Sequence, residues 1–148
     1  MIVVGIIQGK GMDLRGESDT QIFGYDTLDE INRKIQNYAS QLNIKLKLYQ
    51  SNVESEVISI LNGLRGSGVN ALIFNPGEFT GSPGGIGFAL RELTIPVVEV
   101  HTTNPASRGI ISQVQGSCSG TVNGFGILSY LVALTGLAQH LTGDGNDV

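Results

Sequence analysis

Cysteine, tryptophan and histidine are scarce in this sequence. Its 148 residues include one cysteine, Cys118, no tryptophan and two histidines. A single thiol excludes an internal disulfide and a thiolate metal cage, so we expect Cys118 to be a small buried residue. His101 has neither a second histidine nor a carboxylate cluster beside it in the sequence, and we therefore predict no metal site.

Charged side chains are also few. They make up 15% of the residues, and 13 Asp and Glu outnumber 9 Lys and Arg, which gives a formal net charge of -4. The sequence contains no basic stripe with interleaved aromatic residues, so neither a nucleic acid nor an anionic membrane is an expected partner. The small charged fraction favours a homo-oligomer that covers part of the surface.

Long hydrophobic runs are missing as well. The apolar start of the chain has no basic segment and no cleavage-type sequence after it, and the longest apolar run is shorter than a membrane span. These features predict a soluble protein of the cytoplasm. A hydrophobic fraction of 41% at this length predicts a single domain over residues 1–148, because such a chain can bury most of its surface around one core.

Hydrophobic periodicity alternates between that of strands and that of helices. Runs typical of strands cover residues 2–8, 44–50, 71–74, 97–101 and 120–123. Helical spacing predicts helices over residues 28–42, 53–64, 88–93 and 127–141. Two capping boxes, Thr27 to Glu30 and Ser51 to Glu54, are expected to begin the first two helices. The alternation predicts an α/β fold with a five-stranded, mainly parallel sheet and helices on both faces.

Polar residues follow the predicted strands at the point where each strand ends. The carboxyl ends of parallel strands share one edge of the sheet, and ligands bind there, where the strand order reverses. Side chains at four strand ends fit this expectation: Gln8, Ser51, Asn52, Asn75, Glu99, His101, Thr102 and Thr103. We therefore predict a small-molecule site at this edge.

Glu99 and His101 lie on the same face of their predicted strand. Because side chains alternate along a strand, their Cα atoms should be about 6.5 to 7 Å apart. Glu99 can favour the imidazolium form or hold one tautomer, so His101 can act as an acid or a hydrogen-bond donor near neutral pH. In the alternative interpretation, backbone amides satisfy Glu99 and His101 fills space beside it. Their position at a strand end favours a functional site.

Two segments without periodicity flank this edge. Residues 80–87, TGSPGGIG, resemble a phosphate-binding loop but match no nucleotide motif, which favours a flexible turn. Residues 9–25 form a connection long enough to be a lid or a binding loop. This segment carries Lys10, Asp13, Arg15, Glu17, Asp19 and Tyr25. After the fourth strand, Arg108 either clamps a substrate carboxylate or lies on the surface.

Three segments, in the same order along the chain, resemble type II 3-dehydroquinate dehydratases. They read YQSNVESEVISILNGLRG, ALIFNPGEFT and IPVVEVHTTNPASR, where the family carries FQSNxEGxLI, IINPGAxTHTS and PxVEVHxSNxxAR. The resemblance covers nearly the whole chain. It implies a flavodoxin-like three-layer sandwich, trimers that assemble into dodecamers, and cofactor-free loss of water from a cyclic hydroxy-ketone acid through an enolate. The matching family positions are Asn75, Glu99, His101, Thr102, Thr103 and Arg108.

The first loop departs from the family's pattern NGPNLNxLGxRxPxxYG. This chain reads QGKGMDLRGESDTQIFG, which places Gly11 at the asparagine that positions water, Ser18 at the mobile arginine and Phe23 at the tyrosine that helps to abstract the proton. The histidine of THTS is Gly81. Because a phenylalanine has no proton to give or take, the family's base is missing.

A replacement base is needed if the chain is an enzyme. Glu78 follows the third strand directly, where the family has a small residue, and is our first candidate because acid and base must both reach the substrate. A solvated loop glutamate is the alternative interpretation. Asp13, Glu17 and Tyr25 in the first loop are further candidates.

Three functions stay open. The first is a lyase or isomerase of this fold with a different small oxygenated substrate, and the second is dehydration of 3-dehydroquinate with a rearranged lid. The third is a small-molecule-binding protein without activity. We favour the first, because loss of a positioned base costs about 10² to 10⁴ in rate.

The site prediction divides into catalytic and substrate-binding residues. The predicted catalytic residues are His101, Glu99, Asn75, Glu78 and Tyr25. The predicted substrate-binding residues are Thr102, Thr103, Arg108, Gly77, Gln8, Phe23 and Arg15. Neither a cofactor nor a metal is expected.

Overall fold

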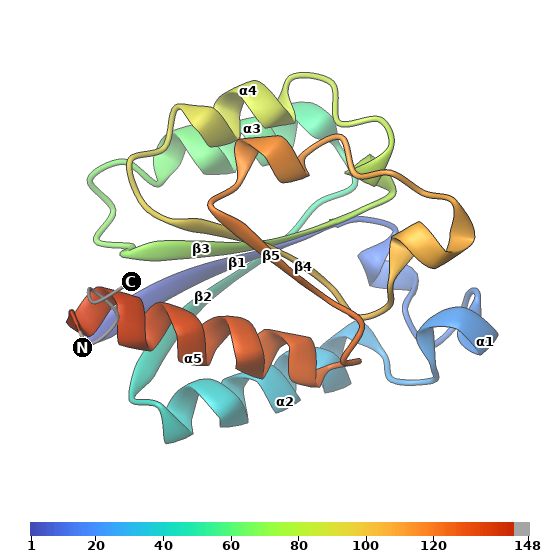
Figure 1. Ribbon diagram of the computed structural model, residues 1–148, viewed down its shortest axis with the longest axis horizontal. Coiled ribbons are helices and arrows are strands. Elements are labelled where there is room, and N and C mark those ends of the chain that lie inside the picture. Colours follow the sequence, from blue (N-terminus) through green and yellow to red (C-terminus); the bar gives the residue numbers. More distant parts are fainter. Residues whose placement is uncertain (144–148) are drawn as a thin grey trace.

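Five parallel strands form one sheet in the order β2-β1-β3-β4-β5. A computed structural model, drawn in Figure 1, describes residues 1–143. The chain runs outward from β1 to β2 and then crosses to the other side of β1, so the strand order reverses between β1 and β3. The strands are β1 (Ile2–Lys10), β2 (Ile44–Gln50), β3 (Ala71–Gly77), β4 (Val97–His101) and β5 (Gly120–Asn123). The predicted α/β, flavodoxin-like arrangement is confirmed, with a sheet that is parallel throughout.

Helices cover both faces of the sheet. Figure 1 shows α2 (Leu28–Gln41) and α5 (Leu128–Thr142) on one face, and α3 (Glu54–Gly63) and α4 (Ile86–Arg91) on the other. None of the helices within residues 1–143 combines the length and the apolar character that a bilayer span requires. The shorter elements are α1 (Thr20–Phe23) and the 3-10 turns η1 (Met12–Leu14), η2 (Glu78–Thr80), η3 (Pro105–Arg108) and η4 (Gln115–Ser117).

Side chains of β1, an interior strand of the sheet, alternate between two hydrophobic cores. In β1, Val4 and Ile6 belong to a cluster with residues of α2 and α5, whereas Ile7 belongs to a cluster with residues of α3 and α4. All three side chains are fully buried. Burial of each contributes about 1.5–3 kcal/mol to stability. The continuous apolar run of β1 is therefore that of a strand covered on both faces, as predicted.

One of the two predicted capping boxes forms. At the start of α2, Thr27 Oγ1 accepts a hydrogen bond from the Glu30 N–H at 3.2 Å, and Glu30 Oε1 accepts one from the Thr27 N–H at 3.1 Å. The box at Ser51 was wrong, because α3 begins only at Glu54 and Ser51 ends the strand region before it. The Ser51 hydroxyl instead donates to Oε2 of Glu56 at 2.6 Å, which ties β2 to α3.

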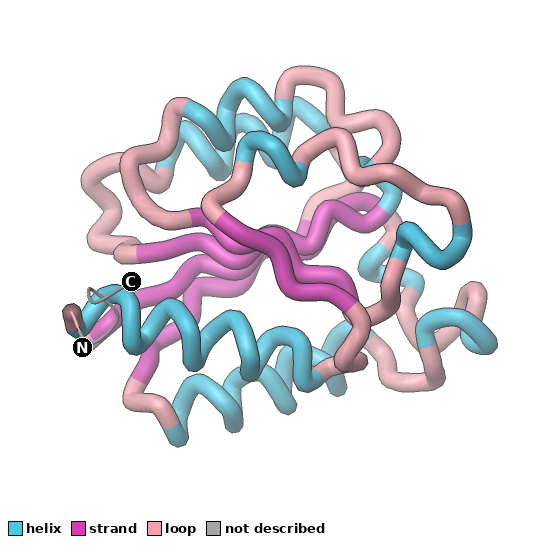
Figure 2. The backbone as a smooth tube through the Cα atoms, viewed as in Figure 1, coloured by secondary structure: helices cyan, strands magenta, loops and turns pink. Residues whose placement is uncertain are grey.

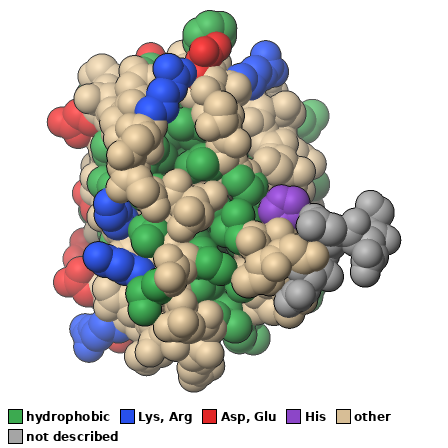
Figure 3. All heavy atoms as spheres, turned by 90° about the vertical axis from the view of Figure 1, so that its left-hand side faces the viewer, with side chains coloured by type: hydrophobic (Ala, Val, Ile, Leu, Met, Phe, Trp, Pro, Cys, Tyr) green, Lys and Arg blue, Asp and Glu red, His purple; other side chains and the backbone are tan. Residues whose placement is uncertain are grey.

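The two ends of the sheet differ in character. Figure 2 shows the loops after β1, β3 and β4 gathered at the carboxyl ends of the strands, where short helices interrupt them. Figure 3 shows the opposite end of the molecule, where apolar and uncharged side chains occupy the middle and charged side chains lie mainly at the margins. The predicted site therefore lies at the end of the sheet with the longer loops.

Gly9 and Gly77 let the ends of β1 and β3 approach closely. Lys10 pairs with Gly77 in the parallel ladder. A Cβ atom on Gly9 would overlap the carbonyl group of Pro76, and one on Gly77 would overlap the carbonyl group of Lys10. Gly77 also has a φ of 57°, in the region that residues with side chains rarely adopt. The two strand ends can therefore share one site.

Gly9→Ala is expected to lower the free energy of unfolding by about 1–3 kcal/mol, because the added methyl group meets backbone atoms that cannot rotate away. Gly63→Ala is the matched control, since nothing lies within 4 Å of a Cβ atom at this last residue of α3. Alanine there should stabilise the helix by up to about 1 kcal/mol. Urea denaturation of both variants measures the two effects, and effects of the same sign would contradict the expectation.

Candidate active site

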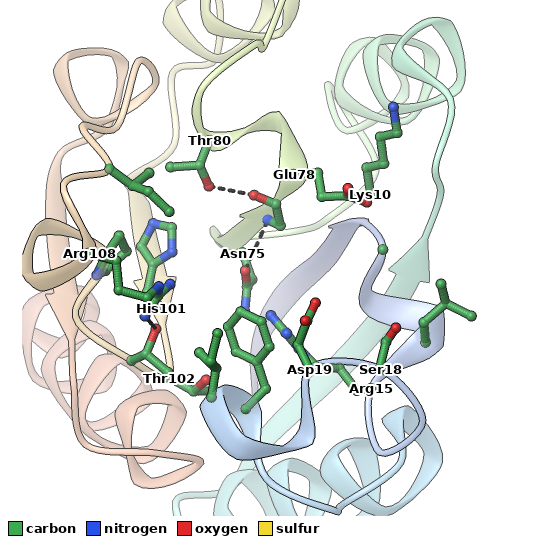
Figure 4. Close-up of a pocket in the computed structure, with 18 of the residues that line it drawn as sticks. Lys10, Arg15, Ser18, Asp19, Asn75, Glu78, Thr80, His101, Thr102 and Arg108 are labelled. Carbon is green, nitrogen blue, oxygen red and sulfur yellow. Dashed lines mark hydrogen bonds between the residues drawn. The ribbon is translucent and has the colours of Figure 1, made fainter.

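A cavity of about 620 Å³ lies at the carboxyl ends of β1, β3 and β4 and is bordered by η1 and α1. Figure 4 shows its polar residues around a common space, with His101 and Arg108 on one side and Lys10 and Glu78 on the other. The lining residues are Lys10, Gly11, Leu14, Arg15, Ser18, Asp19, Ile22, Phe23, Asn75, Gly77, Glu78, Thr80, Gly81, His101, Thr102, Thr103, Pro105, Arg108 and Ile110.

Asn75 is held in one orientation at the floor of this cavity. Its Nδ2 donates to the Tyr130 hydroxyl at 2.9 Å, and the hydroxyl donates in turn to Gln8 Oε1 at 2.8 Å. On the other side, the Gly77 N–H donates to Asn75 Oδ1 at 3.2 Å. Burial raises the pKa of the Tyr130 phenol, and only part of this shift is offset by its hydrogen bonds and by the charge of Arg15. The phenol therefore stays protonated and anchors the amide.

His101 forms a pair with a fully buried carboxylate. Its Nε2 lies 2.6 Å from Glu99 Oε2, and the Ser112 hydroxyl donates to the same oxygen at 2.6 Å. Nδ1 of His101 has no hydrogen bond to any described residue, so it is the ring nitrogen that remains for a ligand. The carboxylate holds the imidazole in one orientation and favours the tautomer that carries its proton on Nε2.

Two guanidinium groups flank the ring of Phe23. Cζ of Arg15 lies 3.5 Å from the ring centroid, and Cζ of Arg108 lies 5.5 Å from it. Such cation–π contacts contribute about 0.5–2 kcal/mol each and hold α1 against the cavity. Arg108 also donates to Thr103 Oγ1 at 3.0 Å. Burial is the main cause that lowers the pKa of Arg15, but an arginine stays protonated throughout the physiological range.

Cations outnumber carboxylates at the cavity wall. Lys10, Arg15 and Arg108 line it, together with the acids Asp19 and Glu78. Within residues 1–143, none of these three cations has a carboxylate oxygen within ion-pair distance. Positive charges that the protein itself leaves unpaired suit a ligand with an anionic group.

Most of the predicted site residues meet in this cavity. The predicted residues that line it are Asn75, Gly77, Glu78, His101, Thr102, Thr103, Arg108, Arg15 and Phe23. Gln8 and Glu99 lie one layer deeper, where they hold Tyr130 and His101 and are shielded from a ligand. Gln8 and Glu99 therefore influence a ligand only through the side chains that they hold, Tyr130 and His101.

The predicted place of Tyr25 in the site is corrected by the structure. Tyr25 is 77% exposed and does not line the cavity. The reason is that α1 ends at Phe23, which lines the cavity, and the chain then turns at Gly24, which has a φ of 83°. Asp13 and Glu17 do not line the cavity either, and Asp13 accepts a hydrogen bond from Asn52 Nδ2 at 3.2 Å.

The predicted site residues did not include Ser112, Tyr130 or the cavity-lining residues Lys10 and Asp19. Ser112 and Tyr130 reach Glu99 and Asn75 from segments far along the chain, and no local pattern marks them. Asp19 had a weak signal as a charged residue of the first loop. It has a φ of 50°, a left-handed conformation that is strained for residues other than glycine and is often found at functional sites.

Among the described residues, no three His, Cys, Asp or Glu side chains gather closely enough to hold a metal ion. Cys118 is only partly buried, less than predicted. Burial and the neighbouring Glu99 charge nevertheless raise the pKa of its thiol to about 12, so it is protonated and unreactive near neutral pH.

The fold and site together define an α/β protein with a small-molecule cavity built around a histidine–carboxylate pair. The sequence profile of the family described as Dehydroquinase class II matches residues 2–138. This chain belongs to that family.

Relatives and solved structures agree with this assignment. The chain is 36% identical over 132 residues to a 3-dehydroquinate dehydratase from Desulforudis audaxviator, covering 87% of each chain. It is 33% identical over 132 residues to a 3-dehydroquinate dehydratase from Caldanaerobacter subterraneus, covering 87% of this chain and 88% of that one. The type II dehydroquinase structure from Butyrivibrio crossotus superimposes with a TM-score of 0.87 at 26% identity, covering 92% of this chain and 97% of that one.

Alkaline titration followed by phenolate absorbance is expected to show one tyrosine that ionises well above the ordinary pKa of 10.0, and Tyr130→Phe should remove it. The folded pKa lies above the unfolded one, so the neutral phenol stabilises the fold below about pH 10 and this contribution is lost as the pH rises further. Denaturation at several alkaline pH values should show a steeper loss of stability for the wild type than for Tyr130→Phe. Identical titration curves would contradict the assignment.

Proposed function

We propose that this protein is a cofactor-free lyase that removes water from a small cyclic hydroxy-ketone acid, with 3-dehydroquinate as the first candidate substrate. The observation that carries the proposal is the convergence of a histidine, an oriented amide and two guanidinium groups in one cavity. Relatives named 3-dehydroquinate dehydratase support this choice of substrate. They favour it over the altered reaction that the sequence analysis ranked first.

His101 serves as the general acid. It lies at the cavity, and its ring is oriented by the buried Glu99 carboxylate, which leaves Nδ1 free to face a leaving hydroxyl group. To act as an acid, the ring must carry protons on both nitrogens, so that Nε2 donates to Glu99 while Nδ1 gives its proton to the leaving group. Positioned proton transfer of this kind contributes about 10² to 10⁴ to a rate.

Arg15 and Arg108 bind the anionic group of the substrate. Both guanidinium groups line the cavity, both lie over Phe23, and neither has a carboxylate partner among the described residues. A guanidinium matches the two oxygens of a carboxylate with parallel hydrogen bonds, which also sets the orientation of the ligand. The acidic class of substrate follows from these two residues.

Glu78 is the base that we assign. Of the bases considered from the sequence, Glu78 is the one that lines the cavity, and this exposed residue lies across Asn75 from His101 (Figure 4). Phe23, at the lid, offers no ionisable group. Tyr130 is excluded because its buried phenol has a raised pKa and already donates to Gln8.

The proposed elimination balances its protons between these two side chains. Glu78 takes the proton from the carbon next to the ketone, which forms an enolate. His101 then gives its proton to the hydroxyl group on the neighbouring carbon, and that group leaves as water while the carbon–carbon double bond forms. Transfer of the proton from Glu78 back to His101 through solvent restores the starting state. Asn75 supplies an oriented amide for the substrate's polar groups.

The same site could act on another hydroxy-ketone, or bind one without turnover. Two departures from the resembling family favour this second candidate: Phe23 stands at the lid, and Gly81 provides no side chain at the cavity wall. Product analysis with a panel of cyclic hydroxy-ketone acids separates these outcomes from dehydration of 3-dehydroquinate.

Purified protein mixed with 3-dehydroquinate is expected to produce the ultraviolet absorbance of a conjugated enone. His101→Ala and Glu78→Gln should each lower kcat by about 10² to 10⁴, because each removes one positioned proton transfer. Glu92→Gln is the matched control, since this carboxylate pairs with Arg65 on the surface. Tyr25→Phe should retain full activity. Loss of activity in Tyr25→Phe with none in Glu78→Gln would overturn the assignment of the base.

Arg15→Gln and Arg108→Gln should each raise KM, or Kd for a bound substrate analogue, by about 10-fold or more. The reason is that each loses one charge-assisted contact with the anionic group. Arg33→Gln is the control, because Arg33 is exposed on α2. Steady-state kinetics with the acid substrate, and calorimetry with its uncharged ester, check the expectation. Equal affinities for the acid and the ester would contradict an anion site.

A further inference from the structure

The carboxylate of Glu78 occupies the space where a side chain on Gly11 would lie. Gly11 follows β1 with a φ of 88°. A Cβ atom built on it would be 2.6 Å from Oε2 of Glu78, 3.3 Å from its Cδ and 3.5 Å from its Cγ. Contacts below 3.0 Å are essentially never seen for a real Cβ atom, so one of the two groups must shift, and the exposed end of the Glu78 side chain can do so at small cost. Any side chain at position 11 would therefore push the Glu78 carboxylate away from its present place.

The backbone on the Gly11 side cannot easily move to relieve such a contact. The Gly11 N–H donates to Asn52 Oδ1 at 2.9 Å. Gln50 Nε2 donates to the same oxygen at 2.9 Å and also to the Gly9 carbonyl group at 3.3 Å. These bonds tie the turn after β1 to the end of β2, and they fix where a Cβ atom at position 11 would point.

The backbone on the Glu78 side is equally constrained. Gly77 packs against the Lys10 carbonyl group so closely that it has no room for a Cβ atom, and it pairs with Lys10 in the sheet. The Thr80 hydroxyl donates to the Gly77 carbonyl group at 2.5 Å and closes the turn of η2. Only the Glu78 side chain itself can give way, and its carboxylate would leave the cavity wall.

We propose that Gly11 is a positioning residue for the reaction: by having no side chain, it seats the Glu78 carboxylate at the cavity wall across Asn75 from His101. The proposal rests on the proposed function for the role of Glu78. It deepens that function by dividing the cavity into two ends. The end at Gly11 and Glu78 accepts a proton or a hydroxyl donor of the substrate, and the end at Arg15 and Arg108 takes its anionic group.

A stability cycle tests the contact independently of any reaction. Gly11→Ala should lower Tm more than Gly68→Ala does, by up to about 2–4 °C, the shift expected for about 1 kcal/mol in a domain of this size. Gly68 is the matched control because its φ is 85° and nothing lies within 4 Å of its Cβ position. In a Glu78→Ala background the excess should vanish. If Gly11→Ala loses the same additional Tm with and without Glu78, the loss does not come from contact with Glu78, and the proposal is overturned.

A kinetic cycle with 3-dehydroquinate tests the consequence. Gly11→Ala should lower kcat by about 10²-fold with a small change in KM, since a displacement of about 1 Å in a reacting group costs that much. The double variant Gly11→Ala with Glu78→Gln should be no slower than Glu78→Gln alone, because both changes remove the same group. Full additivity of the two losses, or an unchanged kcat in Gly11→Ala, would sink the inference.

The two proposals fail in different ways. If the wild type does not turn over 3-dehydroquinate, the proposed substrate is wrong, and the stability cycle alone decides whether Gly11 seats Glu78. If the wild type is active and Gly11→Ala behaves like Gly68→Ala in both cycles, the proposed function stands and the role of Gly11 is overturned.

Discussion

The close approach of the carboxyl ends of β1 and β3 is the constraint on which the site depends. A parallel ladder alone would leave their side chains a strand spacing apart, but Gly9 and Gly77 remove the Cβ atoms that would keep the two turns separate. The strand order reverses between β1 and β3, and the cavity opens beside the carboxyl ends of these two strands. Asn75 and Glu78 are delivered to one cavity because the backbones meet there.

Burial makes the polar groups under the cavity both costly and well oriented. Within the described part of the chain, Glu99 Oε1 and Gln8 Nε2 are buried without a hydrogen-bond partner. Such atoms usually cost about 1–3 kcal/mol each, and proteins keep them where function needs them. Here they belong to the two side chains that hold His101 and Tyr130. The stability lost in this layer is offset by the two hydrophobic cores on either side of the sheet.

The segment between β1 and α2 gives the cavity its particular chemistry. In the resembling family this loop carries an ionisable aromatic side chain, whereas here Phe23 lies against two guanidinium groups. The aromatic ring thus orders cations instead of moving a proton. The carboxylate that we propose in its place comes from the other strand end, at Glu78, so the acid and base of the proposed reaction stand on opposite sides of Asn75.

The sequence by itself determined the strands, the long helices and the polar strand ends, because periodicity and burial are local and repeat along the chain. It also placed Asn75, Glu78 and His101 at one edge, since parallel strands share their carboxyl ends. Only the tertiary structure decided that Tyr25 faces solvent while Phe23 lines the cavity, a choice made by the turn at Gly24, which has a positive φ. Ser112, Tyr130 and the fit of Gly11 against Glu78 likewise depend on long-range packing, which no local pattern encodes.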